Sequence, residues 1–282
     1  MFNRLAVLPQ YLFPKRLLTE WVGKLAAYQG GKWTTKAIER FIHRYKVDMT
    51  EAENADPSSY SSFNAFFTRP LKQGIRPIAD AALISPVDGA ISQLGAISTH
   101  QILQAKGHYY STQTLLGDDA ALAAKFRDGL FATLYLSPRD YHRIHMPCDG
   151  RLTRMMYVPG DLFSVNPTTA RGVPGLFARN ERVVCVFDSE RGPFVMALIG
   201  ATIVGSIETV WHGQVNAPRP GKMVEWSYDD PQLNFKKGDE MGRFLLGSTV
   251  VLLFTKDSYH FNPDWSATGL IRMGEAMGTA AL

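Results

Sequence analysis

The chain has 282 residues, of which 45% are hydrophobic and 11% aromatic, and this is enough to bury a substantial core in one large domain or in one domain with an appended segment. No run of about 18 uninterrupted apolar residues is present, which excludes a membrane-spanning helix. The net charge of +4 is uneven: residues 1–46 carry nine Lys/Arg against two Glu, a local charge of +7, and the remainder sums to −3.

Two further features lead us to expect a cytoplasmic chain. Pro9 and Pro14 interrupt the N-terminal stretch, and no long apolar segment or small-residue cleavage site follows, so the layout of a signal peptide is missing. Cys148 and Cys185 are the only cysteines. Since nothing indicates secretion, we expect them to be buried free thiols.

Residues 1–46 are predicted to form amphipathic helices that prolines interrupt. Two sets of apolar residues follow the i, i+3, i+4, i+7 spacing of one helical face. The first set is Leu18, Trp21, Val22 and Leu25, and the second is Ile38, Phe41, Ile42 and Tyr45. Thr34 or Thr35 is expected to cap the second helix.

Two roles are open for these helices on this evidence. Apolar faces with aromatic anchors beside clustered Lys/Arg suit helices that lie in a membrane interface, where each basic residue contributes about 1 kcal/mol near an anionic surface. Alternatively, the apolar faces dock on the rest of the chain and the charged faces are solvated. Nucleic acid is not supported as a partner, because no motif or arginine-rich recognition helix is present.

The remainder of the chain is predicted to be mostly β. Residues 47–60 are acidic and polar and are expected to form a linker, and a short docking helix is expected within residues 63–72. Short β-like runs then alternate with Gly, Pro and Asp. The predicted strands cover residues 90–97, 130–136, 152–158, 183–187, 194–210 and 249–254, and one Ala-rich helix covers 119–127.

The predicted fold class is therefore α+β, with N-terminal amphipathic helices on a predominantly antiparallel, sandwich-like or barrel-like β core. We divide the chain into a helical region with a linker, residues 1–60, for which membrane association is one of the two open roles, and a β-rich domain, residues 61–282, which contains the residues capable of chemistry. No internal repeat is evident.

Three clusters in the β region carry residues capable of chemistry. Asp88 lies in a turn bounded by Pro86 and Gly89, His142 and His145 lie three apart in a dense polar segment, and Ser248 follows Gly247 at the mouth of an apolar strand. Taken singly, each cluster is equally compatible with a structural role. Asp88 could be a turn aspartate bonded to its own backbone, and Gly247-Ser248 could be a simple turn. A metal site is discounted because no further His or Cys nearby completes a ligand set.

Taken together, Asp88, His145 and Ser248 could form a charge relay. The aspartate orients the imidazole, the imidazole takes the serine proton, and the hydroxyl attacks a carbonyl. Ser248 does not lie in a Gly-x-Ser-x-Gly elbow, which makes a secreted-type protease a poor match.

Four blocks in this order resemble the bacterial phosphatidylserine decarboxylases, a family of membrane-associated proenzymes. The resemblance extends from about residue 60 to 265. The blocks are Phe66-Phe67-Thr68-Arg69-Pro70-Leu71-Lys72, Ser85-Pro86-Val87-Asp88-Gly89-Ala90, Tyr141-His142-Arg143-Ile144-His145-Met146-Pro147 and Leu246-Gly247-Ser248-Thr249.

The resemblance implies self-cleavage between Gly247 and Ser248, with Asp88, His145 and Ser248 as the relay. Ser248 attacks the carbonyl of Gly247, and elimination and hydrolysis leave a β chain, residues 1–247, and an α chain, residues 248–282. Ser248 becomes a covalent pyruvoyl group, the cofactor that forms a Schiff base with the substrate amine. His142 is the candidate proton donor in the decarboxylation, and the division of roles between His142 and His145 stays open.

The implied activity is conversion of phosphatidylserine to phosphatidylethanolamine and CO₂ in phospholipid biosynthesis. The implied partners are phosphatidylserine, an anionic membrane surface and the chain's own α and β pieces as a heterodimer, with further dimerisation left open. The implied location is peripheral, on the cytoplasmic face of the cell membrane. Two other hypotheses remain. The protein could be a decarboxylase for another seryl lipid, or a non-enzymatic membrane-surface protein in which Gly247-Ser248 is an ordinary turn.

Overall fold

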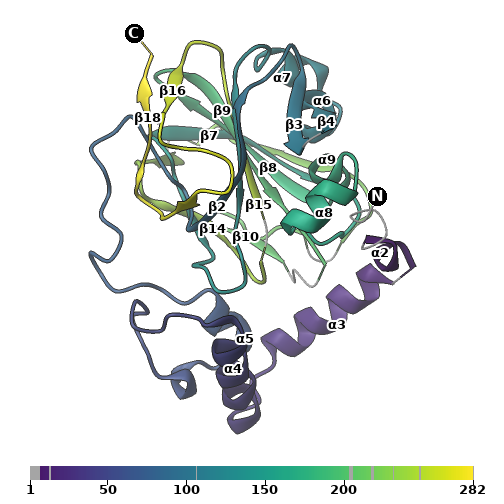
Figure 1. Cartoon of the computed structure of the whole chain (residues 1–282), viewed down its shortest axis with the longest axis vertical. Helices are drawn as coiled ribbons and strands as arrows, with labels where there is room; N and C mark the ends of the chain where they lie inside the picture. Colours follow the sequence, from purple (N-terminus) through teal and green to yellow (C-terminus); the bar gives the residue numbers. More distant parts are fainter. Residues whose placement is uncertain are drawn as a thin grey trace.

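The computed structural model describes residues 7–12, 14–105, 107–202, 206–216, 219–230, 232–247 and 249–281. In these parts N-terminal helices lie beside a mostly antiparallel β core, which confirms the predicted α+β class (Figure 1). The helices are α2 (Pro9–Leu12), α3 (Lys15–Ala27), α4 (Lys32–Tyr45), α5 (Phe63–Phe67), α6 (Thr112–Leu115), α7 (Ala120–Ala124), α8 (Pro167–Gly172) and α9 (Leu176–Arg179), with a 3₁₀ turn at Pro57–Ser59.

The largest sheet has nine strands, and every neighbouring pair is antiparallel. Its order is β12 (Val224–Ser227), β7 (Gly150–Val158), β8 (Arg182–Ser189), β9 (Gly192–Ile199), β15 (Thr249–Phe254), β5 (Leu130–Tyr135), β2 (Gly89–Ala96) and β17 (Leu270–Ile271), and β13 (Asn234–Phe235) also pairs with β7.

Three smaller sheets complete the β structure. A four-stranded sheet has the order β11 (Gly213–Gln214), β10 (Ile207–Thr209), β14 (Glu240–Phe244) and β6 (Arg143–His145). A three-stranded sheet has the order β1 (Leu83–Ile84), β18 (Ala276–Ala280) and β16 (Tyr259–Phe261), and β3 (Gln101–Ala105) pairs with β4 (His108–Ser111).

Strand β15 lies at the centre of the large sheet. It pairs along its whole length with β5 on one side and β9 on the other, and all of its residues are buried. Its side chains alternate between two cores: Val250 and Leu252 belong to one, and Val251 and Leu253 to the other. A strand buried on both faces needs a continuous apolar run, and this explains why the sequence pattern here is not alternating.

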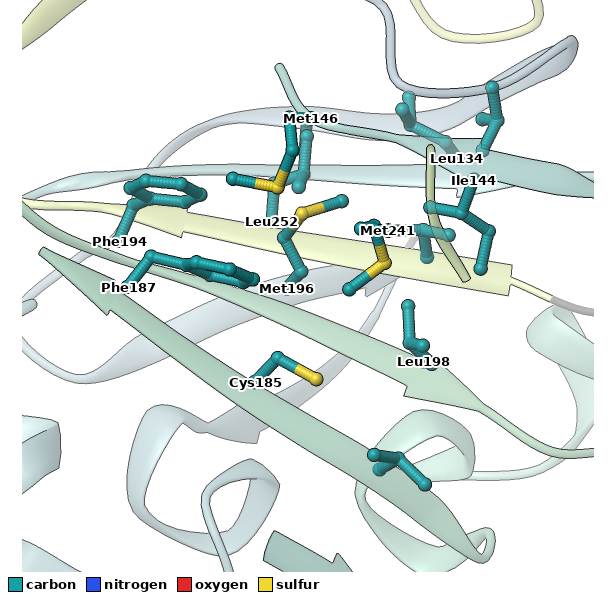
Figure 2. Close-up of a cluster of buried hydrophobic side chains, with 14 of the residues drawn as sticks. Leu134, Ile144, Met146, Cys185, Phe187, Phe194, Met196, Leu198, Met241 and Leu252 are labelled. Carbon is teal, nitrogen blue, oxygen red and sulfur yellow. The ribbon is translucent and has the colours of Figure 1, made fainter. Parts of the chain in front are cut away.

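The first core lies between the large and the four-stranded sheet. Figure 2 shows Met196 and Leu252 of the large sheet packed towards Ile144 and Met241 of the small one, and all four are buried. This packing matters for the site because β6, which carries His145, is held against the large sheet by its apolar neighbours.

The second core lies on the other face of the large sheet. The hairpin β3–β4 and helices α6 to α9 cover that face (Figure 1). Phe126, Leu176 and Phe177 pack there with Val251 and Leu253. Cys148 and Cys185 are both buried and unpaired, as predicted.

The two N-terminal helices differ in what their apolar faces contact. In α4, Phe41 packs its ring 5.1 Å from that of Phe63 and 5.9 Å from that of Phe67, so this face docks on α5. In α3, Trp21 and Leu25 are 69% and 66% exposed. The docking interpretation is therefore right for α4. In α3, Val22 packs against the cluster that contains Phe66, whereas Trp21 and Leu25 of the same face stay exposed.

A third apolar cluster crosses the predicted boundary at residues 60/61. It joins Ala26 and Ile38 of the N-terminal helices to Phe66, Phe67 and Leu246. The division into two domains stays a prediction. Among the described residues, no helix combines the length and apolar character that crossing a bilayer requires.

Two local predictions were wrong in detail. Helix α4 begins at Lys32 with Gly31 as its cap, so neither Thr34 nor Thr35 caps it; Thr34 instead accepts a hydrogen bond from the N–H of Gly30 at 2.9 Å. The run predicted as one strand over 194–210 contains β9 and β10, which belong to different sheets.

Candidate active site

The predicted cleavage position lies between the four-stranded sheet and the centre of the large one. Leu245 follows β14 and its N–H donates to the carbonyl of Ser206 at 2.9 Å, and Leu246 is buried in the cluster with Phe66 and Phe67. Gly247 follows, and Thr249 begins β15. Ser248 lies outside the described residues, so its predicted role stays a prediction.

A cavity of about 320 Å³ borders Gly247. Its walls come from α4, α5, the end of β5 and the segment before α8, and none of its described lining residues carries a charge. They are Phe41, Tyr45, Phe67, Tyr135, Leu136, Pro138, Ser164, Val165, Asn166, Ala201, Thr202, Leu246 and Gly247.

A larger cavity of about 590 Å³ lies between α3 and β10 and reaches Leu245 but not Gly247. Several of its charged residues are already paired, for example Arg16 with Glu20 and Arg219 with Glu181. We place the candidate site at the smaller cavity, because it borders the Gly247 position and the larger one does not.

His142 lies beside Gly247 and is fully buried. Its Nδ1 is 2.8 Å from the carbonyl oxygen of Asp140, and because a carbonyl only accepts, the neutral ring carries its proton on Nδ1. Nε2 is buried without a hydrogen-bond partner among the described residues. A methyl group on Gly247 would lie 3.6 Å from this nitrogen, so the free lone pair of His142 faces the cleavage position.

Packing holds the His142 ring and keeps it neutral. The Phe67 ring lies against it with centroids 4.0 Å apart, and Arg143 Nε donates to the carbonyl of Thr68 at 2.9 Å, which ties α5 to the histidine segment. Burial lowers the pKa of His142 to about 3. The imidazole is thus a neutral proton acceptor at physiological pH.

His145 lies on β6 with both ring nitrogens engaged. Nδ1 is 2.8 Å from the carbonyl oxygen of Gly238, and Nε2 is 3.0 Å from the hydroxyl of Tyr141. Burial lowers its pKa. Unlike His142, this residue has no unoccupied ring nitrogen.

Asp88 lies next to β6 but binds other groups. The His145 N–H donates to the carbonyl of Pro86 at 2.9 Å, so the turn and the strand are adjacent. The Asp88 carboxylate, however, accepts from Arg76 at 3.0 and 2.6 Å and from the N–H of Met273 at 2.8 Å. Within the described residues the fold brings Asp88 and His145 close together without a direct hydrogen bond between them.

Sequence reasoning missed three residues that shape this site. Phe67 and Tyr141 lie inside blocks quoted above but had no role assigned to them, and Arg76, in a Gly-Ile-Arg-Pro loop, resembles an ordinary surface cation. The sequence does not reveal that Arg76 pairs with a buried carboxylate. Only Phe67 and Tyr141 could have been found in advance, because they lie inside the family blocks.

Comparison with known proteins gives a consistent result. Residues 63–279 match the family described as phosphatidylserine decarboxylase, and residues 5–46 match a family described as PSD. The chain is 67% identical to the phosphatidylserine decarboxylase proenzyme of Dechloromonas aromatica (strain RCB), covering 100% of both chains. It is 67% identical to that of Albidiferax ferrireducens, covering 98% of both, and 66% identical to that of Azoarcus sp. (strain BH72), covering 99% of this chain and 96% of the relative.

Proposed function

Because the chain belongs to the phosphatidylserine decarboxylase family, we propose that it cuts itself between Gly247 and Ser248 and then converts phosphatidylserine to phosphatidylethanolamine and CO₂. The observation that carries this proposal is the buried Nε2 of His142 beside Gly247. Within the described part of the chain this nitrogen has no hydrogen-bond partner, and the adjacent cavity has no charged lining residue.

The position of the proposed cut is supported by the strand that follows it. Strand β15 is hydrogen-bonded on both sides, β17 pairs with β2, and β18 pairs with β1. A piece made of residues 248–282 would therefore stay in the sheets after cleavage, because its strands pair with those of residues 1–247. The product is a heterodimer of α and β chains that behaves as one folded unit.

The residues present fit a pyruvoyl group at position 248. Such a group supplies a ketone that can take up the electrons released when a carboxylate leaves as CO₂. Phe67 and Leu136 line the cavity on this side of Gly247, and His142 holds an acceptor nitrogen towards it. Since this nitrogen is unprotonated at physiological pH, His142 would take a proton from the ammonium group of the substrate, which must lose one before its nitrogen can attack a ketone, and would return it to the reacting carbon.

The relay of Asp88, His145 and Ser248 is proposed for the self-cleavage step. In the described arrangement the His145 ring is oriented by the Gly238 carbonyl and Asp88 is held by Arg76. Asp88 then acts on His145 through its charge, which favours the protonated imidazole, unless the carboxylate exchanges partners.

Association with a membrane surface is the second part of the proposal. Leu17, Trp21 and Leu25 on the outer face of α3 are 60%, 69% and 66% exposed, whereas Thr19 and Ala26 on its inner face are buried. Exposed aromatic and aliphatic residues beside Arg16 and Lys24 suit a helix lying at the surface of an anionic bilayer. The chain would bind peripherally, on the cytoplasmic face of the cell membrane, where its lipid substrate resides.

The proposed reaction is tested by supplying phosphatidylserine vesicles to the purified protein and measuring CO₂ and phosphatidylethanolamine. Ser248→Ala is the matched control, because it removes both the nucleophile and the source of the pyruvoyl group. Equal product from wild type and Ser248→Ala would refute the proposal. A parallel assay with a seryl ether lipid distinguishes the competing substrate.

A further inference from the structure

Tyr141 contacts the side chain of His145 within the histidine segment itself. The phenol oxygen lies 3.0 Å from Nε2 of the imidazole, and the two rings are stacked with centroids 5.7 Å apart and an interplanar angle of 29°. Both residues are buried, with 6% and 8% of their surface exposed. A buried hydrogen bond of this kind fixes both the position of the ring and the proton it carries.

The direction of this hydrogen bond follows from the other ring nitrogen. Nδ1 of His145 is 2.8 Å from the carbonyl oxygen of Gly238, and because a carbonyl has no proton to give, Nδ1 is the donor. Nε2 of the neutral ring is then the acceptor, and the Tyr141 hydroxyl donates to it. The N–H of Gly238 in turn donates to the carbonyl of Met146 at 2.9 Å, so backbone on both sides of the turn holds the ring.

The two histidines of the segment therefore differ in one specific respect. Both are oriented by a backbone carbonyl at Nδ1, but Nε2 of His142 has no hydrogen-bond partner among the described residues, whereas Nε2 of His145 is occupied by Tyr141. A phenol suits this place, because the hydrogen bond can reverse. Because Nε2 has a single lone pair, the Tyr141 hydroxyl must first turn its own proton away. Nε2 can then take up the serine proton, the imidazolium N–H donates to the Tyr141 oxygen, and the phenol keeps its own proton.

The surroundings keep the phenol protonated. Burial raises the pKa of Tyr141 well above its usual range, so the hydroxyl remains a donor at any physiological pH. The charged groups that act on the Tyr141–His145 pair are Arg143, Glu240, Arg243 and Asp88. Arg143 and Glu240 neutralise each other in an ion pair of 2.8 Å, and Asp88 and Tyr141 line the same cavity of about 260 Å³.

We infer that Tyr141 is a positioning residue for the self-cleavage step, holding His145 in the neutral form with Nε2 as its acceptor nitrogen. This inference rests on the function proposed above. His145 is thus supported by the hydroxyl of Tyr141 and the carbonyl of Gly238, in addition to the charge of Asp88, which does not bind it directly.

The first test reads the protonation state directly and does not depend on activity. In the uncut Ser248→Ala protein, the ¹⁵N chemical shifts of the histidine rings identify the tautomer of His145, with a His145→Gln spectrum for assignment. We expect a proton on Nδ1, and we expect Tyr141→Phe to move the titration of His145 to higher pH, because the lost hydrogen bond stabilised the neutral ring. A proton on Nε2, or a titration unchanged by Tyr141→Phe, would overturn the inference.

The second test follows self-cleavage during cell-free synthesis over a range of pH. Tyr141→Phe should cut itself about tenfold more slowly at neutral pH, the effect of losing one buried hydrogen bond to the base. Its rate should also reach half of its maximum at higher pH than in wild type, because His145 must be neutral to accept a proton. A merely structural role would lower the rate without moving this midpoint.

Tyr109→Phe is the matched control, because Tyr109 lies on β4 and is 58% exposed. It should cleave at the wild-type rate with the wild-type pH midpoint. If Tyr141→Phe cleaves as Tyr109→Phe does, the inference is wrong while the proposed function stands. If the wild-type chain is never cut, the proposed function fails, and the tautomer measurement still decides the geometry of the pair.

Discussion

The guanidinium of Arg76 binds both carboxylate oxygens of Asp88, with 3.0 Å from Nε to Oδ1 and 2.6 Å from Nη2 to Oδ2. The same Nη2 lies 2.6 Å from Glu51, which precedes the β core in the chain. Burial opposes the charged form of Arg76, but hydrogen bonds to Asp88 and Glu51 outweigh it and raise the pKa of the guanidinium. Asp88 is thus held by two hydrogen bonds from one guanidinium in a largely buried place.

Arg76→Met should therefore destabilise the protein strongly. The Arg76 and Asp88 side chains are 5% and 9% exposed, and removing one partner of a buried ion pair costs about 3–5 kcal/mol because the other charge is left uncompensated. Urea unfolding of the Ser248→Ala protein measures this loss. Arg151→Met is the control: its pair with Asp188 is 38% and 53% exposed, and we expect a loss below about 1 kcal/mol. Equal losses in the two variants would contradict the buried pairing.

His142→Ala should separate decarboxylation from folding. The free Nε2 beside Gly247 is the proposed group for proton transfer, and general acid–base catalysis typically contributes about 10²–10⁴-fold. We expect CO₂ release from phosphatidylserine vesicles to fall by at least about a hundredfold in protein that is still folded by circular dichroism. His260→Ala, an exposed histidine on β16, should retain wild-type activity, and a fully active His142→Ala enzyme would disprove the assignment.

The buried His142 also predicts a dependence of stability on pH. Its pKa is lowered from 6.5 to about 3 in the folded protein, so between these values the unfolded chain binds a proton that the folded chain does not. The free energy of unfolding must then fall as the pH is lowered through this window, by up to about 1.4 kcal/mol per pH unit. In the Ser248→Ala background, His142→Asn should show a shallower slope over this range. Identical slopes would show that His142 is not buried in its neutral form.

The outward face of α3 predicts where membrane binding resides. Trp21→Ser with Leu25→Ser, or deletion of residues 1–25, should shift the protein from the pellet to the supernatant when it is sedimented with anionic vesicles. The reason is that each change removes exposed apolar area that would enter the interface. Leu270→Ser is the control, since Leu270 is 75% exposed on β17, far from α3 in the sequence. Unchanged sedimentation of both α3 variants would refute a membrane role for this helix.

Sequence patterns predicted the core strands well where one or both faces of the strand carry a continuous row of apolar residues. The strand at 249–254 and the strand beginning at 130 match β15 and β5 closely, because long apolar runs bounded by Gly, Pro or polar residues leave few alternatives. The pattern at 194–210 was misread as one strand, since periodicity does not reveal that the chain leaves one sheet and enters another between β9 and β10. Docking of α4 and exposure of α3 were equally invisible, because both helices have amphipathic faces.

For the site, sequence identified the segments but not the contacts between them. The segments of Asp88 and His145 were expected to lie close together, and the N–H of His145 does donate to the carbonyl of Pro86. The side-chain partners Arg76 of Asp88 and Tyr141 of His145 depend on packing that no spacing rule encodes. The relay of Asp88, His145 and Ser248 stays a prediction, with Ser248 outside the described residues.

The most direct test of the central claim is the intact mass of the purified protein. We predict two pieces, residues 1–247 and residues 248–282, with the smaller one carrying a pyruvoyl group in place of the N-terminal serine and therefore no free α-amine. A fully active preparation that consists of one uncut chain with an unmodified Ser248 would contradict the proposal.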